Sequence, residues 1–180
     1  MIFSSPEFIF AFLPITFFVY FILNKFKLLY FGKVWLVLAS LYFYSYWSLN
    51  YLPLMLGSII FNYSLGVQLA KGAKRKKIML TVGIIANLVT LGYYKYANFF
   101  LDNINALSGS HFHLEGIILP IGISFYTFTQ IAFLVDSYYG KAKEYDLVNY
   151  ALFVTFFPHL IAGPILHHKE MMSQFKSLST

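Results

Sequence analysis

The sequence predicts an all-α membrane protein, a polytopic transmembrane helical bundle. Residues 34–70 contain no Asp, Glu, Lys or Arg. A helix rises about 1.5 Å per residue, so roughly 20 apolar residues cross a hydrocarbon core of about 30 Å, and this stretch can supply two crossings. The composition agrees, because 59% of the residues are hydrophobic and only 11% are charged, against about 25% charged in soluble domains.

Six apolar segments follow one another, and we expect each of them to be a membrane segment of one transmembrane domain, residues 1–180. In the first segment, Pro14 is expected to bend the helix rather than end it. The second and third are separated in the sequence SLNYLP, where Pro53 suits the first turn of a new helix. The segments span residues 8–23, 34–48, 52–70, 78–94, 117–135 and 147–166.

The basic residues predict how these segments are oriented. Eight of the 13 Lys and Arg residues lie in two loops, one around residues 25–33 and one at residues 71–77. This distribution is typical of cytoplasmic loops and not of a nucleic-acid-binding face. If both basic loops are cytoplasmic, two crossings separate them, which supports the break near Asn50. The N-terminus and the loop at residues 95–116 then lie on the opposite side.

The aromatic tract at residues 41–51 has two interpretations. It fits an aromatic belt at the membrane surface, and ordinary packing inside the bundle explains it equally well. Its aromatic members beside the proposed hairpin are Tyr42, Tyr44, Tyr46, Trp47 and Tyr51.

The sixth segment is less regular than the others. Pro158, Gly163 and Pro164 fall within seven residues. Irregular backbone at membrane depth needs protein or a water-filled cavity to satisfy it. We therefore favour a broken or re-entrant sixth segment over a plain kinked span.

Polar residues inside the apolar segments are the candidate functional groups, because each needs a partner or a wet cavity. For a single Asn or Gln, hydrogen bonding between helices is the simplest interpretation. His159 could act as a general base or line a hydrophilic path, or be a satisfied histidine of the bundle. The polar residues are Asn62, Gln68, Asn87, Ser124, Thr127, Thr129, Gln130 and His159.

The spacing of potential ligands predicts no metal site. The chain has no cysteine, and His167 and His168 are adjacent, so on a helix they point about 100° apart. Residues 167–175 (HHKEMMSQF) instead suggest a short amphipathic helix at the membrane surface.

Two blocks of sequence carry a family resemblance. Residues 119–141 (LPIGISFYTFTQIAFLVDSYYGK) and 149–175 (NYALFVTFFPHLIAGPILHHKEMMSQF) resemble the paired signature of membrane-bound O-acyltransferases, in particular the bacterial branch of alginate O-acetylation proteins. The resemblance covers nearly all of the chain. It implies a helical enzyme of the bacterial inner membrane that encloses a funnel or tunnel.

The resemblance also implies a reaction. An acetyl group would pass from a cytoplasmic donor, acetyl-CoA acting as substrate with no bound cofactor, to hydroxyls of an exported polysaccharide such as alginate. A periplasmic partner protein would complete the transfer. Family members are more than twice as long, so we expect this chain to be the N-terminal part of the fold, with the catalytic histidine beyond residue 180 and no activity of its own.

The matching motif positions give the candidate site residues. The candidates for lining the passage are Ser124, Tyr126, Gln130, His159 and His167. The structural positions of the motifs are Pro120, Gly122, Pro158, Gly163 and Pro164.

Two alternatives remain. One is a non-catalytic membrane scaffold or transport subunit, although the apolar segments lack the acidic residues typical of transporters. The other is the related transfer of D-alanine to teichoic acid. Composition does not separate the acceptors, and the HHKEMM string favours the polysaccharide branch.

Overall fold

The computed structural model describes residues 4–47, 49–72, 74–108, 118–142 and 146–158. All regular structure within these ranges is helical, which confirms the predicted all-α class for this part of the chain. The elements are η1 (Phe8–Phe12), α1 (Leu13–Lys25), α2 (Leu29–Trp47), η2 (Leu49–Tyr51), α3 (Leu52–Ala70), α4 (Lys76–Ser108), α5 (Ile123–Tyr138) and α6 (Leu147–Thr155).

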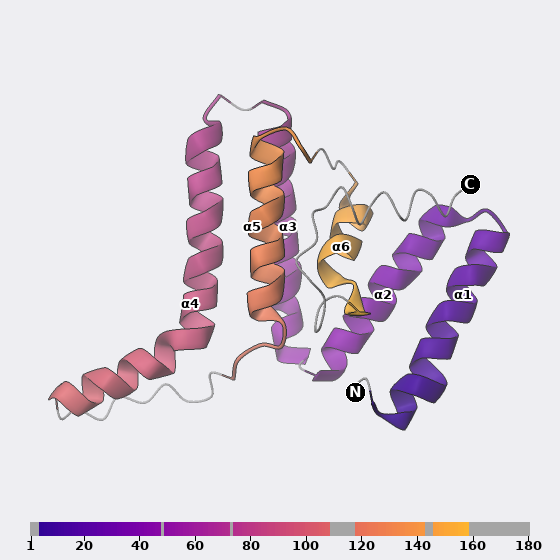
Figure 1. Ribbon diagram of the computed structural model, residues 1–180, viewed down its shortest axis with the longest axis horizontal. Coiled ribbons are helices and arrows are strands. Elements are labelled where there is room, and N and C mark those ends of the chain that lie inside the picture. Colours follow the sequence, from indigo (N-terminus) through magenta and orange to yellow (C-terminus); the bar gives the residue numbers. More distant parts are fainter. Residues whose placement is uncertain (1–3, 48, 73, 109–117, 143–145, 159–180) are drawn as a thin grey trace.

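The helices form two groups that α6 connects. Helices α3, α4 and α5 pack side by side, with α5 against both of the others, while α1 and α2 form an antiparallel pair. The short helix α6 packs against α2 and also contacts α3 and α5. Figure 1 shows it between the two groups.

Pro14 lies in the first turn of α1, directly after a wider helical turn. The N–H of Leu13 donates to the carbonyl of Phe8, five residues earlier, so that η1 is a π-helix. A proline ring clashes with the carbonyl four residues before it in a regular α-helix, and a π turn relieves that crowding. Pro14 therefore interrupts the α-helical pattern without ending the helix, as predicted.

The predicted break between the second and third segments is confirmed. The 3₁₀ turn η2 separates α2 from α3, and Pro53 lies in the first turn of α3. The connections that carry the two basic loops lie at the same end of the bundle in Figure 1. This is the arrangement that the charge pattern predicts.

Three of the described helical stretches are long and apolar enough to cross a bilayer: Phe8–Lys25, Leu49–Ala70 and Lys76–Ser108. Helix α2 has 19 residues, but tyrosines, tryptophans and Lys33 lower its hydropathy. Helices α5 and α6 have 16 and nine residues. The count of six membrane segments stays a prediction.

Two predicted boundaries are wrong. Residues 95–108, expected in a loop, continue helix α4, whose last part bends away from α5 in Figure 1. Apolar residues at helical spacing extend this helix, among them Phe99 and Ile104, which are 61% and 50% exposed. The fifth segment was expected to begin at residue 117, but α5 begins at Ile123 because a turn precedes it.

Helix α6 covers only the first part of the predicted sixth segment. It ends at Thr155, and Phe156 adopts φ −50° and ψ 108°. The next N–H, of Phe157, donates to Ser40 Oγ on α2 at 3.3 Å. Residues 159–166, with Gly163 and Pro164 of the predicted break, lie outside the described residues.

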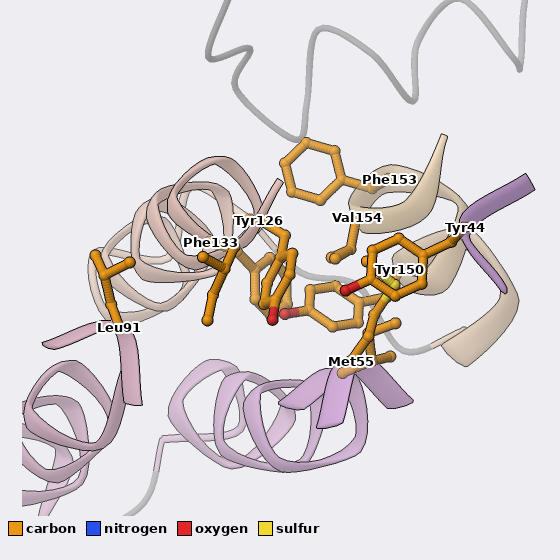
Figure 2. Packing of buried hydrophobic residues seen from close by; sticks show 11 residues of the cluster. Tyr44, Met55, Leu91, Tyr126, Phe133, Tyr150, Phe153 and Val154 are labelled. Carbon is orange, nitrogen blue, oxygen red and sulfur yellow. The ribbon is translucent and has the colours of Figure 1, made fainter. Parts of the chain in front are cut away.

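The main hydrophobic core lies where α3, α5 and α6 meet, with Tyr44 from α2 and Leu91 from α4 (Figure 2). A second cluster joins η1 and α2 through Phe8, Phe12 and Phe43.

The aromatic tract at residues 41–51 divides between its two interpretations. Phe43 and Tyr44 are each 1% exposed and belong to the core, whereas Tyr42 and Tyr46 are 58% and 59% exposed. Bundle packing therefore explains Tyr44, and the membrane-surface interpretation stays open for the outward-facing members.

Candidate functional site

Helix α5 begins at a tight turn formed by Pro120 and Gly122. The Ile123 N–H donates to the Pro120 carbonyl at 3.2 Å. Gly122 has φ 70° and ψ 4°, a conformation that glycine adopts without the strain that a side chain would bring. The Gly122 carbonyl then accepts from the Tyr126 N–H at 2.9 Å. The turn thus fixes where the helix starts and which of its residues face the core.

Two of the candidate passage residues share one face of α5. Tyr126 and Gln130 are one helical turn apart, and they are 1% and 0% exposed. Ser124 is only half-buried and lies about 200° around the helix from Tyr126. The structure therefore brings Tyr126 and Gln130 together and separates Ser124 from them.

A network of amide side chains joins Gln130 to α3 and α4. Its Oε1 accepts from Ser58 Oγ at 2.6 Å and from Asn62 Nδ2 at 2.9 Å. Asn87 Nδ2 donates to Asn62 Oδ1 at 2.6 Å, and Asn62 Nδ2 lies 3.1 Å from Asn87 Oδ1. Asn87 also donates to the Gly83 carbonyl at 2.7 Å. The predicted hydrogen bonding between helices is thereby confirmed for Asn62, Asn87 and Gln130.

A groove of about 390 Å³ between α3 and α4 reaches this network. Ser58, Asn62, Asn87 and Thr90 supply its polar lining. The remaining lining residues are Pro53, Leu54, Gly57, Phe61 and Ala86. The groove therefore borders the network from one side, although Asn62 and Asn87 themselves are buried.

Several buried polar atoms near α5 have no hydrogen-bond partner among the residues that the structure describes. They are the hydroxyls of Tyr44, Tyr126, Tyr150 and Ser137 and the amide Nε2 of Gln130. Figure 2 shows the hydroxyl oxygens of the three tyrosines directed into the interior of the cluster. The hydroxyls of Tyr44 and Tyr126 are close enough to interact electrostatically, without the geometry of a hydrogen bond.

Such atoms are costly in an apolar interior. A buried polar group that has lost its partner costs about 1–3 kcal/mol, and most buried polar groups in proteins are paired. Donors gathered around one helix, with no hydrogen-bond partner among the described residues, can instead bind a polar molecule that enters between the helices.

The other candidate residues lie at or beyond the edge of the described structure. Pro120 is buried, Gly122 is half-buried, and Pro158 is exposed. Lying outside the described residues are the interfacial segment 167–175 and His159, Gly163, Pro164 and His167. Among the residues that are described, no three His, Cys, Asp or Glu side chains are placed to hold a metal ion together.

The sequence analysis does not include three members of the polar interior, Ser58, Ser137 and Tyr150. Ser58 lies one turn before Asn62, and that spacing is the available signal. For Tyr44 the sequence leaves packing inside the bundle and a place at the membrane surface equally open. Nothing in the local sequence distinguishes Tyr44 from the exposed Tyr42 and Tyr46.

Comparison with known proteins identifies the family. The model of the membrane-bound O-acyltransferase family, MBOAT, matches residues 41–179. This chain belongs to that family. Its apolar helices and its family together make it part of a multi-pass membrane protein.

Bacterial proteins named for O-acetylation are among its relatives. The "Peptidoglycan O-acetyltransferase" of Helicobacter pylori is 45% identical over 98% of this chain and 39% of its own length. The "Probable alginate O-acetylase AlgI" of Pseudomonas aeruginosa is 39% identical over 97% of this chain and 34% of its own length. The protein of that name from Azotobacter vinelandii is also 39% identical.

The MBOAT chain spans less than half the length of these relatives, between 34% and 39%. No solved structure matches it. The family assignment therefore rests on sequence similarity.

Proposed function

We propose that this MBOAT chain is the N-terminal portion of an O-acetyltransferase of the bacterial inner membrane. The enzyme takes acetyl groups from acetyl-CoA on the cytoplasmic side and passes them toward hydroxyls of an exported glycan. A periplasmic partner protein completes the transfer, and the N-terminus faces the periplasm. The proposal assigns no catalytic residue within the described part of the chain.

The observation that supports a role for α5 is its buried, unpartnered polar atoms. The Tyr126 hydroxyl lies in the apolar cluster, and the Gln130 amide Nε2 lies one helical turn further along the same face; both are hydrogen-bond donors without a partner among the described residues. A carbonyl oxygen of an acetyl group can accept from such donors. We therefore assign Tyr126 and Gln130 to the lining of the acyl path, with Tyr44 and Tyr150 beside them.

The names of the relatives suggest two acceptors. Alginate and peptidoglycan are both glycans that carry hydroxyl groups. The branch resemblance of the motifs supports an alginate-like exported polysaccharide. The 45% identity to the peptidoglycan enzyme favours peptidoglycan as the second candidate.

An acetylation assay tests the function. The gene is deleted, and ester-linked acetate is released by mild alkali from purified peptidoglycan and from exported polysaccharide. We expect acetate to fall in one of these fractions and to return on complementation. Unchanged acetate in both would contradict the proposal, and loss of ester-linked D-alanine from teichoic acid would establish the alternative acceptor.

Substitutions on α5 test the path. In the complemented strain, Tyr126→Phe and Gln130→Leu should each lower acetate incorporation about tenfold, which corresponds to about 1.4 kcal/mol of lost stabilisation. Phe128→Leu is the matched control, because Phe128 is 45% exposed on the same helix. Protein levels are compared by immunoblotting of membranes. Full activity of both variants at normal levels would exclude these two side chains from the path.

A further inference from the structure

A second groove, unrelated to the polar interior, lies between the first two helices. It has a volume of about 580 Å³. Phe12, Thr16 and Ala39 are buried and form its floor. Its sides are more exposed, with Ile15, Leu38, Tyr42 and Tyr46 each more than half accessible. The remaining lining residues are Glu7, Ala11 and Trp35.

The two ends of this α1–α2 groove differ. At one end, Trp35 Nε1 donates to the Thr16 carbonyl at 3.1 Å and ties the helices together. At the other end lie Glu7, directly before η1, and Tyr46, in the last turn of α2. The groove therefore runs from the ends of the two helices to a bonded position part-way along them.

Its length matches one leaflet of a bilayer. Glu7 to Thr16 and Trp35 to Tyr46 correspond to roughly 14 and 17 Å at about 1.5 Å per residue. Half of a hydrocarbon core of about 30 Å is about 15 Å. An acyl chain that starts at the headgroup level beside Glu7 would extend as far as Trp35.

The charge at the open end selects among headgroups. Among the described residues that line the groove, Glu7 is the only ionisable one besides the two tyrosines, and none is Lys or Arg. A carboxylate attracts an ammonium group and repels a headgroup that carries only negative charge. Glu7 is exposed, and hydrogen bonds from its own backbone and from Ser5, together with the positive charge of the N-terminus, lower its pKa, so it is ionised at neutral pH.

We propose that the α1–α2 groove binds an aminophospholipid, with one acyl chain between α1 and α2 and the headgroup ammonium on Glu7. This inference is independent of acetyl transfer. It concerns the lipid-facing side of the hairpin, and the residues on which it depends are not those assigned to the acyl path.

Tryptophan quenching tests it directly. The chain has two tryptophans, so Trp47→Phe leaves Trp35, in the groove wall, as its only reporter. The 180-residue chain is placed in phosphatidylglycerol bilayers that contain equal fractions of phosphatidylethanolamine or phosphatidylglycerol with mid-chain bromines. We expect about two- to fivefold stronger quenching by the brominated phosphatidylethanolamine, the range for an exposed charge pair.

Two variants and a control separate the contribution of the headgroup charge from that of the bound acyl chain. Glu7→Gln should remove the preference between headgroups and keep quenching by both lipids. Ala11→Phe should fill the groove and reduce quenching by both. Ile9→Phe adds volume on the same helical segment outside the groove, and it should behave like the parent. Circular dichroism checks that each variant remains helical.

The opposite results would overturn the proposal. Equal quenching by the two lipids in the parent would show that Glu7 selects no headgroup. Absence of quenching by either lipid would show that a protein segment, rather than a lipid, covers the groove.

Discussion

At the scale of single residues, the interior of the bundle depends on amides that satisfy one another. Asn62 and Asn87 are 0% and 5% exposed and exchange hydrogen bonds between α3 and α4. Each also bonds to a backbone carbonyl of its own helix, Ser58 and Gly83 respectively. Gln130 adds α5 to the same network. One polar residue from each helix thus fixes how the three helices are aligned.

Substituting one asparagine should lower the free energy of unfolding by more than the contribution of the hydrogen bonds that this residue makes. Asn62→Leu or Asn87→Leu leaves the other amide unsatisfied, so each should lower the free energy of unfolding by about 1–3 kcal/mol. The double variant should cost less than the sum of the two, because neither partner then remains unpaired. Chemical unfolding in detergent, followed by circular dichroism, measures this cycle.

Asn103→Leu is the control for the cycle. Asn103 is exposed on α4, and within the described part of the chain its side chain bonds to the Phe99 carbonyl of its own helix alone. It should change the unfolding free energy by less than about 0.5 kcal/mol. Strict additivity of Asn62→Leu and Asn87→Leu would show that the two amides are not coupled.

At the scale of helices, two glycines allow α5 to pack closely against its neighbours. A Cβ on Gly66 of α3 would overlap the ring of Phe133, and a Cβ on Gly83 of α4 would lie 2.7 Å from a methyl carbon of Leu134. Membrane helices gain most of their association energy from such close contact, because lipid is as apolar as the side chains. These positions explain why α5 lies between α3 and α4.

Gly66→Ala should therefore separate α3 from α5. We expect a loss of about 1–3 kcal/mol from overpacking, measured as a lower thermal midpoint of the detergent-solubilised protein. Gly57→Ala on the same helix is the matched control, since a Cβ there meets nothing within 4 Å. It should be neutral or slightly stabilising, because alanine favours helix more than glycine does. Equal midpoints for the two variants would contradict the close contact.

At the scale of the whole molecule, the positions of the basic residues and the connections between the helices distinguish the same two ends of the bundle. The loops after α1 and after α3 lie at one end of the bundle (Figure 1). Lys33, early in α2, donates to Asn149 of α6 at 3.0 Å. This bond joins the hairpin to the short helix near the basic end. Helix α4, at 33 residues, spans about 50 Å, which exceeds the membrane core and accords with its bend.

Topology reporters test this arrangement. A fusion at Gly72, in the α3–α4 loop, should report the cytoplasm, and a fusion at Gly109, after α4, should report the opposite side. Alkaline phosphatase and green fluorescent protein give complementary signals in the two compartments. The same compartment for both fusions would contradict a crossing by α4.

The sequence was sufficient to predict the long apolar helices of the first and third segments. The start of α3 at Leu52 followed from Pro53, and a continuous first helix through Pro14 followed from its apolar flanks. The structure corrected the end of α4 and the start of α5. The mean hydropathy of the sequence around these two boundaries does not mark them, because Phe99 and Ile104 are apolar although exposed, and because the turn at Gly122 lies within an apolar stretch.

The sequence by itself determined that this protein lies in a membrane, that it is helical, and to which family it belongs. The helical class follows because in lipid each helix satisfies its own backbone hydrogen bonds. Only the tertiary structure decided which side chains face inward. Tyr44 turns into the core while Tyr42 faces outward, and Ser58 joins Asn62, Asn87 and Gln130. The physical reason is that core and lipid are equally apolar, so hydropathy does not separate the faces of a helix. Contacts between helices distant in the chain separate them instead.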